Sequence, residues 1–194
     1  MYRGTVLPKQ EQQDLIRRAK EYDSSAFASI YEHYYEDVYN YIYHRVTNAP
    51  VAEDLTAEVF LKALDSIASF TFRGVPLSVW LFRIARNLVA DHFRRGPGLV
   101  EVPLKEGMLP LEAGADDVFE KELTQQQLAR ALSNLTEDQQ DVIILRFVDG
   151  FSTADVAQVL GKSVGAVKSL QSRALNSLNR FLEIDQTSEV SKKT

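Results

Sequence analysis

Residues 152–175 read STADVAQVLGKSVGAVKSLQSRAL, a stretch that predicts two helices joined by a very short turn. Ser152 can cap the first helix, because a serine hydroxyl accepts a hydrogen bond from a free backbone N–H of the first turn. Gly161 is placed to end that helix, and Ser163 can cap the next one. Two helices joined by such a glycine-containing turn are typical of the helix-turn-helix motif.

The second helix of this pair, expected to run to about Leu182, sorts its side chains onto two faces. Its apolar residues share one face, and its basic, amide and hydroxyl residues share the other. No acidic residue lies between Lys162 and Arg180. Such a face suits phosphates and base edges, and the start of a recognition helix enters the major groove. The alternative is an ordinary solvated face. The candidate DNA contacts are Lys168, Ser169, Ser172 and Arg173.

A further helix is expected just before this pair. Thr136 and Gln139 form the pattern of a capping box in front of an apolar run. The helix should continue through Phe147 and stop at the Asp-Gly pair of residues 149–150. The three helices make up a second unit, which we place at residues 124–182.

An acidic segment at residues 97–123 separates this unit from the first one. It holds three of the six prolines and carries seven acidic and two basic residues, so the entire net charge of −5 resides there. It has neither a helical nor an alternating period. We expect a flexible linker here and a polar tail at residues 183–194.

The first unit, at residues 23–96, also reads as helical throughout. Apolar residues recur at steps of three and four from Phe27 to Val46, which is typical of a buried helical stripe. Pro50 is well placed at the start of another helix. Residues 1–22 form an N-terminal extension or first helix. The predicted fold class is all-α, with two small helical domains joined by a flexible linker and a helix-turn-helix in the C-terminal one.

The last helix of the first unit reads WLFRIARNLVADHFRR over residues 80–95 and concentrates basic side chains on one face. Basic groups can follow a phosphate backbone while exposed aromatic rings stack on unpaired bases. The pattern therefore predicts a surface for single-stranded nucleic acid. The alternative places the aromatic residues, including Phe70, in the core and leaves the arginines as a solvated face. This helix and the loop before it contain Phe72, Arg73, Trp80, Arg83, Arg86 and Asn87.

An acidic helix is expected at residues 51–64, VAEDLTAEVFLKAL. Glu53, Asp54 and Glu58 lie close together there with one lysine, Lys62. An acidic and partly apolar face of this kind can dock on a basic partner helix. The alternative is that the carboxylates simply stabilise the first helical turn.

Several classes of function are excluded by what the sequence lacks. It has no cysteine, three scattered histidines and no glycine-rich phosphate loop, which argues against zinc sites and nucleotide hydrolysis. No apolar run reaches the roughly 18–20 residues of a membrane span, and the N-terminus lacks the apolar core of a signal peptide. We expect a cytoplasmic protein that is not an enzyme, holds no cofactor or metal, and does not insert into a membrane.

Three motifs together resemble a known family. AEDLTAEVFLKAL (residues 52–64), WLFRIARNLVADHFRR (80–95) and LTEDQQDVIILRFVDGFSTADVAQVLGKSVGAVKSLQSRAL (135–175) are similar, in this order, to the extracytoplasmic-function (ECF) sigma factors of bacterial RNA polymerase. The resemblance covers both conserved domains of that family. It implies a transcription initiation factor that directs core RNA polymerase to promoters.

The resemblance also implies a role for each motif. The acidic helix would dock on the β′ clamp helices, with Asp54, Glu58 and Phe60 as contacts. The basic helix and its loop would read and melt the −10 element, and the last helix would read the −35 element close to the β flap. The linker would thread toward the RNA exit path. The expected partners are core RNA polymerase, promoter DNA and an anti-sigma factor.

Two alternatives stay open at this point. One is a helix-turn-helix regulator that binds duplex DNA without being a polymerase subunit. The other is a helical module that sequesters an anti-sigma factor. Because neither unit has a large net positive charge, we expect the free chain to bind duplex DNA weakly and to gain specificity only on core polymerase.

Overall fold

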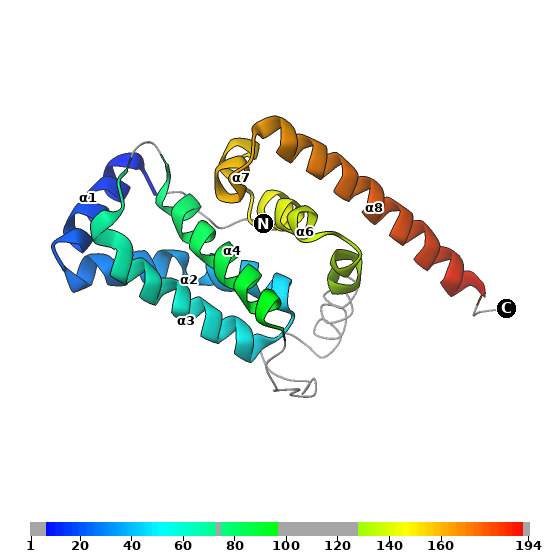
Figure 1. Ribbon diagram of the computed structural model, residues 1–194, viewed down its shortest axis with the longest axis horizontal. Helices are drawn as coiled ribbons and strands as arrows, with labels where there is room; N and C mark the ends of the chain where they lie inside the picture. The colour runs from blue at the N-terminus through cyan, green and yellow to red at the C-terminus, as the bar shows by residue number, and fades with distance from the viewer. Residues whose placement is uncertain (1–6, 73–74, 97–127, 192–194) are drawn as a thin grey trace, which may run out of the picture.

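The computed structural model describes residues 7–72, 75–96 and 128–191, with side chains described as far as Phe181. All regular secondary structure assigned within these ranges is helical, which confirms the predicted all-α class (Figure 1). The linker expected at residues 97–123 lies outside the described residues, and so does Arg73.

The first unit is built from helices α1 to α4. Their apolar faces meet in one core, where Ile30, Val38 and Val59 are all but completely buried. The stripe predicted from Phe27 to Val46 faces this core, although Tyr31 within it is 40% exposed. The elements are α1 (Lys9–Lys20), α2 (Ser24–Val46), α3 (Ala49–Ser66), the 3-10 turn η1 (Ile67–Ser69) and α4 (Leu77–Arg95).

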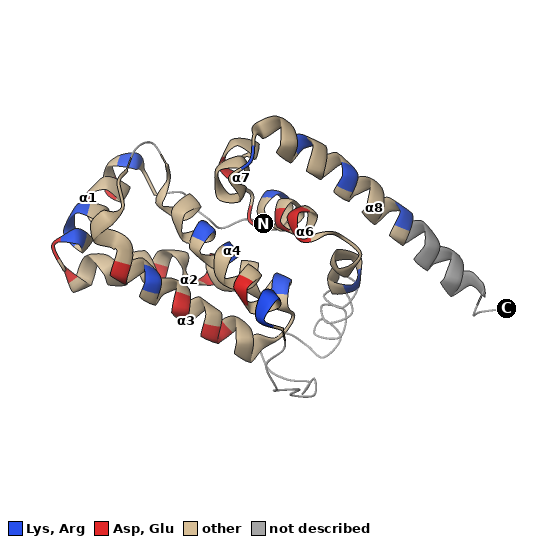
Figure 2. Cartoon of the chain, in the orientation of Figure 1, with Lys and Arg blue, Asp and Glu red and all other residues tan. Residues whose placement is uncertain are grey.

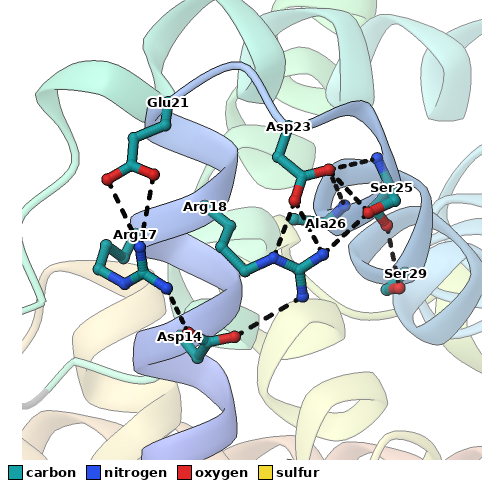
Figure 3. A network of polar contacts seen from close by, with 8 residues as sticks. All are labelled: Asp14, Arg17, Arg18, Glu21, Asp23, Ser25, Ala26 and Ser29. Carbon is teal, nitrogen blue, oxygen red and sulfur yellow. Dashed lines mark hydrogen bonds and ion pairs between the residues drawn. The ribbon is translucent and has the colours of Figure 1, made fainter.

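Helix α2 begins with a cap that is reinforced from α1. The Asp23 carboxylate accepts hydrogen bonds from the backbone N–H groups of Ser25 at 2.9 Å and Ala26 at 3.4 Å. Arg18 of α1 donates from Nε to the same carboxylate at 2.8 Å (Figure 3). The Ser25 hydroxyl and Arg18 lower the pKa of Asp23 to about 2. The cap therefore stabilises the start of α2 and also fixes the turn between α1 and α2.

Helix α3 starts where the sequence predicts. The Asn48 side chain accepts a hydrogen bond from the backbone N–H of Val51 at 3.1 Å. Pro50 sits in the first turn, where its missing N–H leaves no bond unmade. The cap and the proline together fix the register of the helix, which decides which side chains face outward.

The second unit contains a helical segment at residues 128–133, α6 (Glu137–Ile143), η2 (Ile144–Val148), α7 (Thr153–Leu160) and α8 (Val164–Ser191). The capping box is confirmed, since the Thr136 N–H donates to Gln139 Oε1 at 3.0 Å. The single helix predicted through Phe147 is interrupted, because η2 is a π-helical turn. The Asp149 N–H donates to the Ile144 carbonyl five residues back at 2.9 Å. This widening shifts the helical phase of the residues that follow.

The helix-turn-helix is confirmed in detail. Ser152 accepts a hydrogen bond from the Asp155 N–H at 3.1 Å, and Ser163 accepts one from Ala166 at 3.2 Å. Gly161 ends α7 with a φ of 63°, a conformation that costs little only without a Cβ atom. Helix α8 continues to Ser191, beyond the end expected near residue 182.

The two units pack against each other. Helix α4 of the first unit packs against α7 of the second, and Arg86 of α4 is bonded to Asp141 of α6. The rings of Phe82 on α4 and Phe151, just before α7, meet edge to face with 4.7 Å between their centroids. Both residues are buried, so the cores of the two units are continuous. The sequence did not predict how the two units would pack against each other.

We predict that two leucines of α3 differ sharply in their contribution to stability. Leu55 is 9% exposed and Leu61 is 63% exposed. Leu55→Ala should lower the free energy of unfolding by about 2–5 kcal/mol, because it removes packed apolar volume. Leu61→Ala, the matched control, should change it by less than about 0.5 kcal/mol. Urea denaturation followed by circular dichroism measures both, and equal losses would contradict the described core.

We predict a contribution to stability from Asp23 that is lost in acid. Folding lowers its pKa to about 2, so the ionised carboxylate stabilises the fold above its unfolded pKa of about 4 and stops doing so as the pH falls through about 2. Asp23→Asn keeps a capping oxygen but removes the charge. The melting temperature of the wild type should exceed that of this variant near neutral pH, and the gap should close between about pH 4 and pH 2. A gap that does not change with pH would contradict the assignment.

Candidate nucleic-acid and polymerase interfaces

Helix α8 presents its basic and polar residues to solvent. Val167, Leu170 and Ala174 are buried against the rest of the second unit. Figure 2 shows lysine and arginine along the described part of α8 and no acidic residue there. The backbone carbonyls of Gly165 and Ser169 accept hydrogen bonds from the Ser169 hydroxyl and from Arg173 Nε, respectively. All four predicted contacts are exposed on this one face, namely Lys168, Ser169, Ser172 and Arg173.

The aromatic residues around the start of α4 are buried or partly buried. Phe70 is 8% exposed, and its ring lies against that of Trp80 with 4.6 Å between the centroids. Phe72 and Trp80 are partly buried and pack against the core. The structure therefore places Phe70 in the core, as the alternative held, and leaves Phe72 and Trp80 partly exposed.

The polar residues predicted on α4 divide into two groups. Asn87 is exposed and belongs to the outer surface. Arg83 and Arg86 are engaged by the second unit: Arg83 Nε donates to the backbone carbonyl of Gln158 at 2.7 Å. Arg86 Nε donates to Asp141 Oδ2 at 2.9 Å. Arg86 is thus partly buried against the second unit, with its side chain 26% exposed, whereas Arg83 stays exposed despite its hydrogen bond.

A buried charge network lies beneath that contact, and no pattern in the sequence predicted it. Asp141 of α6 is 2% exposed, and its Oδ1 accepts hydrogen bonds from the Tyr41 hydroxyl at 2.9 Å and from the guanidinium of Arg45. Tyr41 and Arg45 belong to α2, so the network joins the two units. Burial and the neighbouring Asp141 raise the pKa of Tyr41 well above its usual value, which keeps the hydroxyl proton available for donation.

The outer face of α3 carries both acidic and apolar side chains. Asp54 and Glu58 are exposed, as the docking prediction requires. Phe60, predicted as a contact, is 3% exposed and packs inside the first unit, with its ring centroid 4.7 Å from that of Tyr31. The sequence analysis missed Leu61, which is 63% exposed. Its position three residues after Glu58 was the available signal, because it puts a leucine on the acidic face.

A ladder of tyrosine rings on α2 was also missed. Tyr31, Tyr35, Tyr39 and Tyr43 follow one another at steps of four, and their neighbouring ring centroids lie 5.1, 6.2 and 6.0 Å apart. Burial is the main cause that raises the pKa of Tyr35 and of Tyr39, and Glu53 of α3 contributes. The four-residue spacing in the sequence could have revealed this ladder, whose Tyr31 and Tyr35 rings pack against Phe60 of α3.

Other kinds of site find no support within the described ranges. No group of three or more histidine, cysteine, aspartate or glutamate side chains is arranged there to hold a metal ion. None of the helices described is both long enough and apolar enough to cross a membrane.

Comparisons with known proteins agree with this arrangement. Sigma-70 region 2 matches residues 30–96, and Sigma-70 region 4 matches residues 125–178. The chain is 42% identical to the ECF RNA polymerase sigma factor BldN of Streptomyces coelicolor, over 89% of this chain and 66% of that protein. It is 31% identical to the ECF RNA polymerase sigma factor SigX of Bacillus subtilis, over 81% of this chain and 84% of that protein.

A solved structure resembles the fold of most of the chain. The sigma factor RpoE of Bartonella quintana, in co-crystal with the anti-sigma factor NepR, has a TM-score of 0.64 and 28% identity, and the match covers 82% of this chain and 98% of that one. Regions 2 and 4 in one chain identify a promoter-specificity factor that is not an enzyme, and they do not favour a regulator that acts without polymerase. The chain belongs to the ECF RNA polymerase sigma factors, as its three motifs predicted.

Proposed function

We propose that this chain docks on core RNA polymerase through α3, reads the −35 element with α8, and contacts and melts the −10 element with α4. The observation that carries the proposal is the exposed face of α8, where Lys168, Ser169, Ser172 and Arg173 lie together with no carboxylate among them. A helix-turn-helix that is capped at both helices and has a recognition face of this composition supports insertion into the major groove.

The roles of the four α8 residues follow from their chemistry. Lys168 and Arg173 are long cations that reach phosphates or the acceptor edge of guanine. Ser169 and Ser172 are short hydroxyl residues that contact either phosphates or bases. Their helix is held by Val167 and Ala174, both 0% exposed, so the reading face is carried on a rigid support.

Docking on the polymerase is assigned to the outer face of α3. Exposed Asp54 and Glu58 supply charge complementary to a basic partner helix, and Leu61, one turn beyond Glu58, supplies an apolar anchor. Leu64, which is 43% exposed, extends the anchor along the same helix. We assign this face to the β′ clamp helices and the second unit to the β flap. Phe60 lies beneath this face and contributes only to the packing of α3.

Recognition of the −10 element is assigned to Phe72, Arg73, Trp80, Arg83, Arg86 and Asn87. The cations would follow the backbone of the separated strand, and Trp80 would stack on a base. Because Arg86 is bound to Asp141 and Asp138 of the second unit, its part in this role requires those two contacts to break.

The proposed function also defines where the chain works and what regulates it. We place it in the cytoplasm, where it meets RNA polymerase and chromosomal DNA. The Bartonella relative was solved with an anti-sigma factor, and we propose a partner of the same kind for this chain. No cofactor is needed for any of these steps.

We predict that reversing one charge on α8 lowers promoter use. Lys168→Glu removes a cation from the reading face, which should reduce run-off transcription with core polymerase by at least about fivefold, the equivalent of about 1 kcal/mol. Lys9→Glu, an exposed lysine of α1, is the matched control and should transcribe like the wild type. Equal transcription by the two variants would contradict the assignment of α8.

We predict that reversing one charge on α3 weakens polymerase binding. Asp54→Lys should raise the Kd for core polymerase about tenfold or more, because it places a cation against a basic partner surface. Glu11→Lys on α1, also exposed, makes the same change elsewhere and should bind normally. Fluorescence anisotropy of labelled protein titrated with core polymerase measures both constants. Unaltered binding by Asp54→Lys would contradict the assignment of the docking surface to α3.

A further inference from the structure

Helix α4 begins at a buried position, directly after a residue that cannot cap it. In its first turn Leu77 and Val79 are 0% exposed, and Ser78 is 9% exposed. The first backbone N–H groups of a helix have no partner within the helix, and a buried one has to find its partner elsewhere. The residue before the helix is Pro76, whose ring carries no acceptor. Another element therefore has to supply the acceptor for this turn.

Gln12 of α1 supplies that acceptor. Its Oε1 accepts a hydrogen bond from the Leu77 N–H at 3.0 Å, across 65 positions of the sequence. Its Nε2 donates to the Leu7 carbonyl at 2.6 Å. Gln12 is 3% exposed, so both ends of its amide are bonded in a site shielded from water. One side chain thus joins the segment before α1 to the first residue of α4.

Helix α1 also holds the other end of the connection between η1 and α4. It packs against η1, and Phe70 follows directly after that turn. The Phe70 ring lies against that of Trp80, the fourth residue of α4, with 4.6 Å between the centroids. The backbone N–H of Trp80 donates in turn to the Pro76 carbonyl at 3.3 Å. Helix α1 therefore fixes both sides of the region that carries these aromatic rings.

We propose that Gln12 is a positioning residue for recognition of the −10 element, because it sets where α4 begins and so holds Phe72 and Trp80 in the arrangement that receives an unpaired base. This role rests on the proposed function of α4, whereas the position of α4 itself does not. Apolar packing is not directional. The amide of Gln12 adds a fixed distance between α1 and the backbone of α4, which apolar side chains alone do not provide.

Two substitutions at Gln12 separate its hydrogen bonds from its volume. Gln12→Met keeps an unbranched side chain of similar size and removes both bonds, which leaves the Leu77 N–H and the Leu7 carbonyl unsatisfied. Gln12→Glu keeps an acceptor for Leu77 and loses only the donor to Leu7, and a negative charge is favourable at the start of a helix. Gln12→Glu should therefore resemble the wild type more closely than Gln12→Met does. The reverse order would overturn the cap.

Two controls match these variants. Gln13→Met makes the same change at the neighbouring exposed position of α1. Ile30→Val trims the core of the first unit, where Ile30 is 1% exposed, and so lowers stability without removing a polar contact. Far-ultraviolet circular dichroism verifies that all four variants remain helical.

The position of α4 is measured in the unlabelled full chain, because Trp80 is its single tryptophan. Gln12→Met should shift the Trp80 emission to longer wavelength and raise its quenching by acrylamide, since the contact with Phe70 loosens. The Leu77 amide, followed by nuclear magnetic resonance, should exchange its hydrogen about tenfold faster in this variant. Neither control should change these quantities. Unchanged emission or unchanged exchange in folded Gln12→Met would overturn the positioning role.

The consequence for promoter use is measured with core polymerase. Gln12→Met should bind core polymerase with the Kd of the wild type, because the outer face of α3 is untouched. Its run-off transcription should fall about fivefold, the equivalent of one lost hydrogen bond, while Gln13→Met and Ile30→Val should transcribe like the wild type. An equal fall in Ile30→Val, or no fall in Gln12→Met, would overturn the role in recognition.

Trp80→Ala distinguishes a failure of this inference from a failure of the proposed function. Normal transcription by Trp80→Ala would contradict the assignment of Trp80 to the −10 element, and with it the recognition role of Gln12. The hydrogen exchange of Leu77 would still decide whether Gln12 fixes the start of α4. Reduced transcription by Trp80→Ala together with normal transcription by Gln12→Met would overturn the inference about Gln12 alone.

Discussion

The buried carboxylate of Asp141 is the contact on which the arrangement of this sigma factor depends. Its oxygens are bound by Arg45 and Arg86 from two helices of the other unit, in a site that water barely reaches. A buried charge that loses its partner is costly, so the two units have one register in which they can pack closely. The surrounding apolar contacts, such as that between Phe82 and Phe151, hold the units together but do not by themselves select one relative position of the two units. The ion network selects the geometry.

Because the two units pack in this way, the two helices proposed to read DNA differ in how accessible their polar faces are. Helix α8 keeps its basic face exposed, since its opposite side is held by its own unit. Helix α4 is shared: its apolar side belongs to the first core, and Arg83 and Arg86 on its outer side are bound to the second unit. The acidic and apolar face of α3 lies away from that contact, with Leu61 exposed. The surface proposed to meet polymerase is therefore accessible while part of the surface proposed to meet DNA is covered.

The features that the sequence could predict are those set by neighbouring residues. Caps such as Thr136 with Gln139 and breaks such as Gly161 depend on local backbone bonding, and both are where the sequence places them. The polar face of α8 follows from a period of 3.6 residues, so Lys168 and Arg173 could be assigned to one side. The π turn at residues 144–148 inserts an extra residue into that period, and no local signal in the sequence marked it.

The features that could not be predicted depend on distant residues. Asp141 and Arg45 are 96 positions apart, and nothing in either neighbourhood singles them out. Phe60 and Leu61 are adjacent apolar residues of α3, yet one is buried under Tyr31 and the other faces solvent. Which of the two would face outward depended on the packing of α3 against α2. Arg86 was correctly placed on the polar side of α4, but its partner on another unit was not foreseeable from that placement.

The most direct test is the distance between Arg86 Nε and Asp141 Oδ2, which is 2.9 Å in the free chain. It can be measured in a cryo-electron microscopy structure of the chain assembled with core polymerase on promoter DNA. The account predicts that the pair is broken there, with Arg86 turned to the DNA and Asp141 in water or against the polymerase. An Arg86 that remains bound to Asp141 in the assembled complex would contradict it.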